Sequence, residues 1–308
     1  MLFKDIIGQE FIKKHLTASV DRGRVAHAQL FVGKAGSGVL PMAIAYAQYL
    51  VCANKNGENQ GENTACNLKF DNLSHPDIHF AYPVATTDKV KSHPVSSHFF
   101  KEWRDFVASS PYGNLYDWHQ HIGIGKKQGQ IGVDEALDIV KSLSLKSYEG
   151  GFKVMIIWMA DKMNIAASNK LLKLIEEPPN KTVFILIAEN DDQIIDTIKS
   201  RCQILHFPPL GEMAMQQALV KDHNCEPALA QKIAHQANGD YNTALHILQK
   251  DGEEEQFETW FVAWVRTAFK ARGNKKAVID LISWSETIAA LGRETQKSFL
   301  KYCEDFFR

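Results

Sequence analysis

The stretch that decides the fold of this chain is Gly33-Lys34-Ala35-Gly36-Ser37-Gly38-Val39-Leu40. Its glycine framework matches a phosphate-binding loop, G-x-x-x-x-G-K-[ST], in which the lysine reaches the β- and γ-phosphates and the hydroxyl holds Mg²⁺. Val39 stands where that lysine belongs, and Leu40 stands where the hydroxyl belongs. We therefore expect a degenerate cofactor-binding loop, formed by Gly33, Gly36, Ser37 and Gly38, that keeps its shape but binds no cofactor.

The flanking segments favour such a loop over an isolated glycine-rich turn. Residues 28–32 are a short apolar run of strand length, and residues 39–52 have apolar side chains at helical spacing. Strand, glycine loop and helix thus follow one another in the required order. Lys34 lies too early in the loop to replace the missing lysine, and we expect its side chain to point to solvent.

The second half of an ATPase site is also missing. Residues 153–161 predict a buried strand that runs into a helix. In an active ATPase this strand ends in an Asp that holds Mg²⁺, followed by a Glu that orients the attacking water. Trp158 and Met159 occupy these two positions, and Asp161 is expected to cap a helix that begins at Lys162. No ATPase activity is therefore expected from this chain alone.

Five further segments make a resemblance to a known family specific. They are IIGQ (6–9), AHAQLFVG (26–33), SHPD (74–77), NKLLKLIEEPP (169–179) and TIKSRC (197–202). With them the chain resembles the delta-prime subunits of bacterial DNA polymerase III clamp loaders, which are AAA+ proteins, as far as about residue 250 and more faintly beyond. The resemblance implies an α/β fold, in which an AAA+ P-loop NTPase-like parallel sheet domain precedes a small helical lid and a partial all-α collar.

The triplet Ser200-Arg201-Cys202 supplies a positive functional hypothesis. In the family this triplet holds an arginine finger, which reaches across a subunit boundary to the ATP of a neighbour. A guanidinium suits that role because it is always charged and its planar fork matches phosphate oxygens. The resemblance thus implies that Arg201 is catalytic in trans, with Ser200 and Cys202 supporting the motif. The alternative is that Arg201 makes an ordinary surface ion pair.

Two sensor positions agree with a silent nucleotide site. Residues 182–188 are a continuous apolar run, typical of a strand that is buried on both faces of a parallel sheet. Asn190 follows near the sensor 1 position of the family, although a turn-forming Asn is equally plausible there. Residues 239–245 resemble the sensor 2 segment, and Asn242 lies where active members have an arginine.

No metal site is expected. Many bacterial relatives have a four-cysteine zinc module after the loop helix, and structural zinc needs four ligands. Only Cys52 and Cys66 occur before His75, and the polar segment 54–63 between them has no C-x-x-C spacing. His75 and His79 would complete a set of four, but each belongs to another predicted feature. A decayed or absent zinc site is the favoured interpretation.

Composition agrees with a cytoplasmic protein. The 308 residues carry a formal net charge of −1, which argues against a protein that grips DNA strongly by itself. The length predicts two or three globular domains. Five scattered cysteines form no disulfide framework, and neither a membrane-length apolar run nor a signal-peptide pattern occurs.

The sequence divides into three predicted domains. Residues 1–209 form the AAA+ nucleotide-binding-like domain, residues 210–250 the helical lid and residues 251–308 the helical collar. The first domain contains an insertion, residues 86–130, in which aromatic and basic side chains are interleaved. These are Trp103, Tyr112, Tyr116, Trp118, His98, Lys101, His119 and His121. Such side chains can stack on bases, but packing of a small subdomain on its parent is the favoured interpretation.

The collar segment has an apolar stripe at helical spacing, made of Phe257, Trp260, Phe261, Trp264 and Phe269. In the family, the C-terminal helices pack into a collar between subunits. The sequence ends at Arg308 within an apolar helical pattern, without a C-cap glycine or a polar tail. We expect that the collar is incomplete, that the natural chain extends further, and that the exposed apolar surface favours self-association.

The resemblance implies a non-hydrolysing stator subunit of the clamp loader. Such a subunit helps to open the sliding clamp and load it onto primed DNA, in a hetero-pentameric ring with motor (gamma or tau) and delta subunits and without contact with a membrane. The ring is part of a DNA-directed DNA polymerase holoenzyme. The alternative is an ATP-hydrolysing AAA+ motor subunit or related ATPase, and a third hypothesis is a nucleotide sensor. A motor would need polar groups at Val39, Leu40, Trp158 and Met159.

Overall fold

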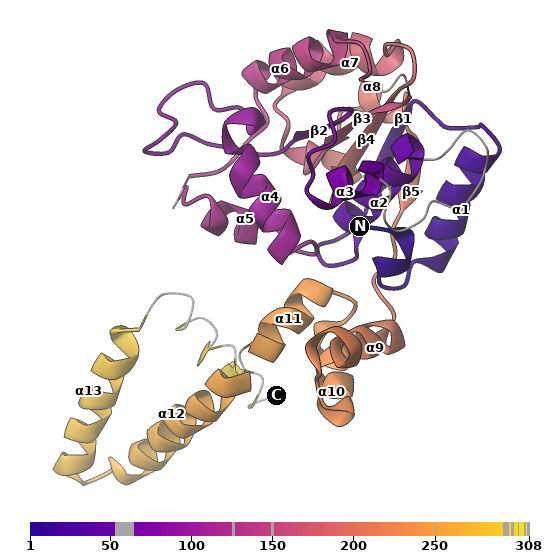
Figure 1. Cartoon of the computed structure of the whole chain (residues 1–308). Helices are drawn as coiled ribbons and strands as arrows, with labels where there is room; N and C mark the ends of the chain where they lie inside the picture. Colours follow the sequence, from indigo (N-terminus) through magenta and orange to yellow (C-terminus); the bar gives the residue numbers. More distant parts are fainter. Residues whose placement is uncertain are drawn as a thin grey trace. The chain divides into compact units, whose positions relative to one another are not determined.

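A five-stranded parallel sheet forms the centre of the N-terminal part of the chain (Figure 1). The computed structural model describes residues 1–52, 65–124, 127–148, 151–249, 251–291, 296, 299–300, 302–304 and 306. It divides the chain into two compact units, Met1–Ala244 and Leu245–Arg308. The strands are β1 (Ala28–Val32), β2 (Ile78–Ala81), β3 (Lys153–Ile157), β4 (Thr182–Ala188) and β5 (Gln203–His206).

The strand order β2-β3-β4-β1-β5 places the first strand inside the sheet, between two strands that follow much later in the sequence. All four pairings are parallel, and Leu30 of β1 lies opposite Leu186 of β4 on one side and Ile204 of β5 on the other. Parallel neighbours require crossover connections, and these contain the helices. The predicted α/β class with a central parallel sheet is therefore confirmed.

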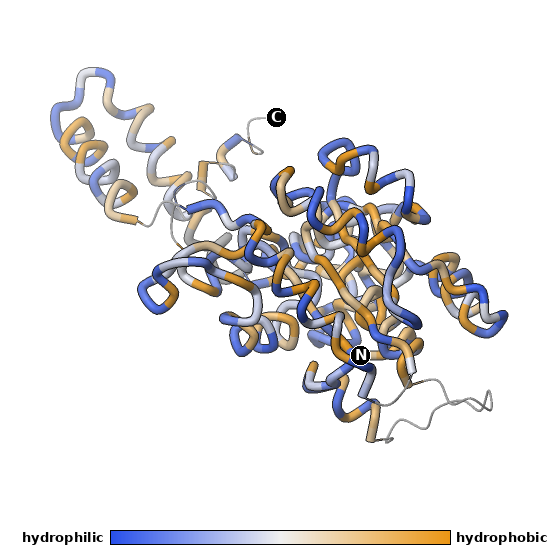
Figure 2. The backbone as a smooth tube through the Cα atoms, turned by 90° about the horizontal axis from the view of Figure 1, so that it is seen from above, coloured by the Kyte–Doolittle hydropathy of each residue, from blue (hydrophilic) through white to orange (hydrophobic). Residues whose placement is uncertain are grey.

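Helices cover both faces of this sheet because both faces are apolar. Along β4, Val183 and Ile185 pack on one face, while Phe184 and Leu186 pack on the other. In Figure 2 many of the hydrophobic residues gather in the middle of this unit. The helices of the first unit are α1 (Glu10–Asp21), α2 (Val39–Cys52), α3 (Ala65–Asp71), α4 (Phe100–Ser109), α5 (Leu115–His121), α6 (Val133–Ser144), α7 (Ile165–Glu176), α8 (Asp196–Lys199), α9 (Glu212–His223), α10 (Pro227–Ala237) and the first part of α11 (Tyr241–Gln249).

The predicted strand 28–32, helix 39–52 and strand 182–188 are confirmed to the residue. The predicted helix start at Lys162 is wrong. Met159 adopts a left-handed conformation (φ 56°), and only a short 3₁₀ turn, Ala160–Lys162, follows it. Helix α7 begins at Ile165, where the side chain of Asn164 accepts the cap hydrogen bond from the Ala167 N–H at 2.8 Å.

The insertion packs on its parent domain through aromatic rings. Trp103 and Trp118 are both fully buried. Trp103 stacks on Tyr82 with ring centroids 4.1 Å apart, and it lies 5.2 Å from the ring of Trp158 at the end of β3. The packing interpretation of the insertion is therefore confirmed for these two rings, whereas Tyr116 remains 47% exposed.

The start of the insertion is anchored by a buried carboxyl group. Glu135 of α6 accepts a hydrogen bond from the Ser96 N–H at 2.6 Å. The backbone N–H of Tyr82 donates to the Ser96 hydroxyl at 2.9 Å, and the phenol of Tyr82 donates to the Ser96 carbonyl at 2.8 Å. Burial raises the pKa of the Glu135 carboxyl to about 7. This group therefore changes its protonation near neutral pH.

In the part of the second unit that the structure describes lie the helices α12 (Asp251–Lys270) and α13 (Lys275–Ala289). They meet through Trp264 and Trp284, whose rings stack with centroids 5.7 Å apart. Phe257 is buried, as the apolar stripe predicts, but Phe269 is 83% exposed. Among the described residues, no helix has the length and apolar character needed to cross a membrane. The predicted domain borders at 209/210 and 250/251 stay predictions.

We predict that Glu135→Gln stabilises the protein at pH 8 but not at pH 5. The folded-state pKa lies above that of an unfolded glutamate, so the folded state binds more protons between about pH 4.5 and pH 7, and stability falls as the pH rises through this window. The neutral amide escapes that loss, which amounts to about 3 kcal/mol. Urea unfolding at both pH values measures the difference.

Asp105→Asn, a change at an exposed carboxylate of α4, is the matched control. We expect its free energy of unfolding to follow that of the unmodified protein at both pH values. Equal stabilisation by Glu135→Gln at pH 5 and pH 8 would contradict the titration of Glu135.

Candidate functional site

The glycine loop adopts a compact turn between β1 and α2. Gly36 and Gly38 have φ angles of +69° and +86°, a left-handed conformation that glycine adopts without steric cost. The hydroxyl of Ser37 donates a hydrogen bond to the Lys34 carbonyl at 2.6 Å and so closes the turn. At Gly33, a Cβ atom would lie only 2.7 Å from the Val39 side chain. The loop therefore packs directly on the residue that replaces the phosphate-binding lysine.

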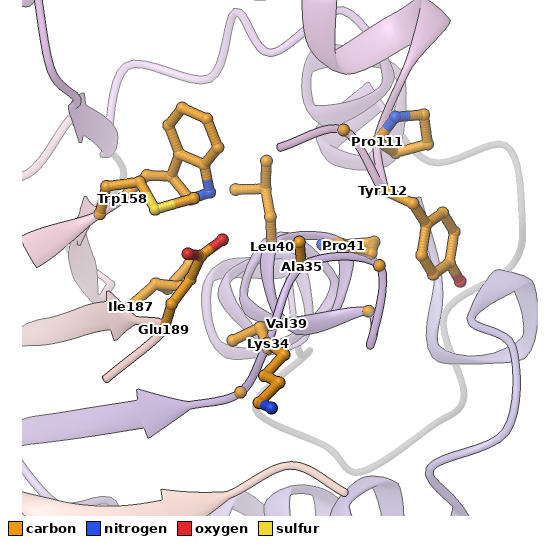
Figure 3. A pocket seen from close by; sticks show the side chains of 15 residues that line it. Lys34, Ala35, Val39, Leu40, Pro41, Pro111, Tyr112, Trp158, Ile187 and Glu189 are labelled. Carbon is orange, nitrogen blue, oxygen red and sulfur yellow. The ribbon is translucent and has the colours of Figure 1, made fainter. Parts of the chain in front are cut away.

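The space over this loop is almost filled. The cavity there holds only about 30 Å³, whereas pockets for small-molecule ligands hold about 300–1,000 Å³. Figure 3 shows Trp158 on one side, Leu40 in the middle and Tyr112 on the opposite side. The Lys34 side chain points away from these residues, and Lys34 is exposed, as expected. In this conformation the site has no room for a nucleotide.

The two positions of the missing acidic pair are buried in apolar surroundings. Trp158 and Met159 are 2% and 4% exposed. Of the neighbouring carboxylates, Asp161 pairs with Lys162 at 2.8 Å rather than capping a helix. Glu189 lines the cavity, and burial together with the nearby charge of Asp161 raises the pKa of its carboxyl.

Glu189 is a site residue that was not predicted from the sequence. It directly follows the last residue of β4 and lies at the carboxyl edge of the sheet, a position that is a signal for a site residue. The predicted residue was its neighbour Asn190. The Asn190 side chain accepts a hydrogen bond from the Asp192 N–H at 2.9 Å, which is the turn-forming role.

The lid segment lies directly on the loop. The Tyr241 N–H donates to the Gly36 carbonyl at 3.2 Å. The Asp240 carboxylate caps α11 by accepting from the Thr243 N–H at 3.0 Å, and a Cβ atom at Gly36 would overlap it. Asn242, at the sensor 2 position, donates from its side chain to the Asp117 carboxylate at 2.7 Å. This polar group is therefore committed to the insertion rather than to the loop.

Arg201 lies between α8 and β5, away from this cavity. Its Nη2 atom pairs with Glu176 Oε2 at 3.0 Å, and its Nη1 donates to the Thr197 carbonyl at 2.9 Å. The Arg201 side chain is 32% exposed, and its Nε has no hydrogen-bond partner among the described residues. Within one chain, Arg201 thus makes the surface ion pair that the sequence analysis gave as the alternative to an arginine finger.

The neighbours of Arg201 support the backbone. The Ser200 hydroxyl donates to the Thr197 carbonyl at 3.2 Å. Burial raises the pKa of the Cys202 thiol to about 11, so this thiol stays protonated at neutral pH and is a poor nucleophile. The Ser200 contact helps to fix the turn that presents Arg201.

The two cysteines of the discussed zinc region are joined. Cys52 and Cys66 form a disulfide, with Cα atoms 5.8 Å apart, which the sequence analysis did not anticipate. His75 is engaged elsewhere, since its Nδ1 accepts from the Asp77 N–H at 3.1 Å. Among the described residues, no group of three or more His, Cys, Asp or Glu is placed to hold a metal ion. The segment 54–63 lies outside the described residues, and the zinc expectation stays a prediction.

Comparison with known proteins identifies the family. Residues 8–211 match the model of a family described as "DNA polymerase III, delta subunit". The chain belongs to this family. DNA polymerase III subunit delta' of Bacillus subtilis is 29% identical over 230 residues, which cover 75% of this chain and 56% of that protein. The aligned part thus spans little more than half the length of this curated relative.

Two other proteins are similar to this chain. DNA polymerase III subunit tau of Bacillus subtilis is 26% identical over 80% of this chain and 37% of its own length. Among solved structures, the RuvB Holliday junction branch migration motor of Thermotoga maritima is 16% identical, with a TM-score of 0.48 over 81% of this chain and 63% of its own. The recognition of the delta-prime family is confirmed by the family match and by the delta' relative.

We predict that Cys202 reacts slowly with iodoacetamide at pH 8. Its pKa of about 11 lies about two units above that of an ordinary thiol, so the thiolate fraction is about 100-fold smaller. Mass spectrometry of time points taken under native and denaturing conditions measures the rate at this residue. Equal rates in the folded and unfolded protein would show that the thiol is not held protonated by burial.

Proposed function

We propose that this chain is the non-hydrolysing stator of a bacterial clamp loader, in which it helps to open the sliding clamp and load it onto primed DNA. The proposal is supported above all by the closed nucleotide loop, where about 30 Å³ remain beside Val39, Leu40 and Trp158. A family member whose nucleotide site is filled by its own side chains would act in the ring as a structural subunit and through residues that it provides to neighbouring subunits. Its partners are motor subunits of the gamma or tau type and a delta subunit.

Arg201 is the residue that this proposal offers to a neighbour. Its guanidinium is one-third exposed and makes its ion pair with Glu176, which is itself 54% exposed. Exposed pairs of this kind contribute about 0–1 kcal/mol to stability. The guanidinium therefore leaves Glu176 at little cost when a triphosphate of a neighbouring subunit offers a denser negative charge. In this function the Glu176 pair holds the finger in position before assembly.

The alternative, an ATP-hydrolysing motor, conflicts with the described geometry. A motor needs an acidic pair at the end of β3, and both of those side chains are packed in the apolar core. Glu189, whose carboxyl group lines the cavity, has a raised pKa, and the cation that acts on it within the described part of the chain, Lys162, pairs with Asp161. Nucleotide sensing without hydrolysis conflicts with the same lack of space.

We predict that the purified chain binds no MgATP. Calorimetric titration to about 1 mM nucleotide should give only heats of dilution, because a ligand must displace buried side chains before it can enter. Val39→Lys alone should bind none either, since the acidic pair is still absent. A motor subunit titrated under the same conditions serves as the positive control. Saturable heat from the unmodified chain would refute a closed site.

We predict that Arg201→Ala still assembles but slows hydrolysis at one site of the ring. Loss of one transition-state donor costs about 2–4 kcal/mol, or roughly 30- to 1,000-fold in rate at that site. Single-turnover hydrolysis in a ring reconstituted with motor and delta subunits, in the presence of clamp and primed DNA, measures this loss.

Glu176→Gln is the matched control, because it breaks the same ion pair but keeps the guanidinium. We expect this variant to hydrolyse ATP as fast as the unmodified ring. If both substitutions slow the reaction equally, the ion pair within the chain is what matters, and Arg201 is no finger.

A further inference from the structure

Tyr112 joins separate segments of the first unit beside the degenerate loop. It lies in the turn after α4, where the Gly113 N–H donates to the Ser110 carbonyl at 2.9 Å. Its ring packs against the loop, since a Cβ atom added to Gly38 would lie 3.2 Å from Tyr112 Cε1. Its phenol oxygen accepts a hydrogen bond from the Ile7 N–H at 2.9 Å. The insertion thus reaches both the loop and the N-terminal segment through one side chain.

The same ring contacts the lid. The rings of Tyr112 and Tyr241 meet edge to face, with centroids 5.1 Å apart. The Tyr241 N–H in turn donates to Gly36 of the loop. A second link between the insertion and the lid is the hydrogen bond from Asn242 to Asp117. The lid is therefore tied to the loop directly and through the insertion.

Tyr112 fills space in a way that an external ligand would. It is only 8% exposed, and it lines the residual cavity together with Val39 and Leu40 (Figure 3). Burial raises the pKa of its phenol to about 12, so the ring is neutral at physiological pH. Its phenol oxygen accepts one hydrogen bond from the Ile7 N–H, and its ring packs against the ring of Tyr241 and the backbone of Gly38. A planar aromatic molecule with one hydrogen-bond acceptor could make the same contacts.

We propose that Tyr112 is a built-in ligand of the degenerate site, which fills the site and holds the lid on the loop without nucleotide. The proposal rests on the proposed function, in which the site binds no nucleotide. It assigns to the insertion the task of closing the site. It also identifies the ligand class that the site takes once the ring is removed, namely small phenols. An engineered cavity of comparable origin binds benzene in another protein.

The test is chemical replacement of the missing ring. Tyr112→Ala should lower the Tm by about 10 °C, the usual result of removing a buried aromatic ring. Phenol at about ten times its dissociation constant should restore about 3 °C of this loss. Phenol should not change the Tm of the unmodified protein. Tyr116→Ala, at a half-exposed ring of the same insertion, is the control and should neither lose stability nor respond to phenol.

Hydrogen exchange reports whether the lid is affected. In Tyr112→Ala, the Tyr241 amide should exchange at least about tenfold faster than in the unmodified protein, and phenol should restore its protection. In Tyr112→Phe, the ring remains but the hydrogen bond from Ile7 is lost. The Ile7 amide should then exchange about tenfold faster while the Tyr241 amide stays protected.

Absence of any phenol effect on the Tm and on Tyr241 exchange of Tyr112→Ala would overturn the proposal. If that variant does not fold, Tyr112→Phe decides, and unchanged Ile7 exchange would overturn it. The effect of MgATP on the Tm distinguishes failure of the proposed function from failure of this inference. A Tm increase of the unmodified protein with MgATP would refute the closed site, whereas phenol rescue without any MgATP effect supports both.

Discussion

The N-terminal unit depends on the burial of Trp158 at the end of β3. This ring lies 5.2 Å from Trp103 and 6.0 Å from Phe106, both of which belong to the insertion. A buried aromatic ring removes about 150–250 Å² of surface from water, far more than the carboxylate that an ATPase has at the same position. The side chain at the end of β3 thus forms part of the surface on which the insertion packs.

The loop and the region of Arg201 differ in polarity. At the loop, Val39 and Leu40 are almost fully buried. The Arg201 side chain is one-third exposed and is held by an ion pair with Glu176 and a hydrogen bond to a backbone carbonyl. The proposed stator function would use this combination, because it requires a filled nucleotide site and an accessible cation that reaches a neighbouring subunit.

Local sequence patterns predicted the strand, loop and helix around residues 28–52 because each depends on neighbouring residues. The sequence predicted that the insertion packs on its parent domain, but not which residues make the contacts. The hydrogen bond from Ile7 to Tyr112 spans 105 residues, and the one from Asn242 to Asp117 spans 125. The spacing of apolar residues along the sequence gives no information about contacts between residues so far apart. The predicted helix cap at Asp161 is wrong for a different reason. Met159 has a left-handed backbone conformation, and only a 3₁₀ turn follows it, so no α-helix begins there.

The aromatic packing at Trp158 also has a consequence for attempts to build an ATPase site into this fold. A carboxylate placed at that position would be surrounded by Trp103 and Phe106 and would lose its hydration, at a cost of several kcal/mol. A lysine placed at Val39 would meet a loop beside which only about 30 Å³ remain. Each single substitution therefore costs stability before it brings any catalytic benefit, so the polar groups would have to be introduced together with changes in the insertion that packs on them.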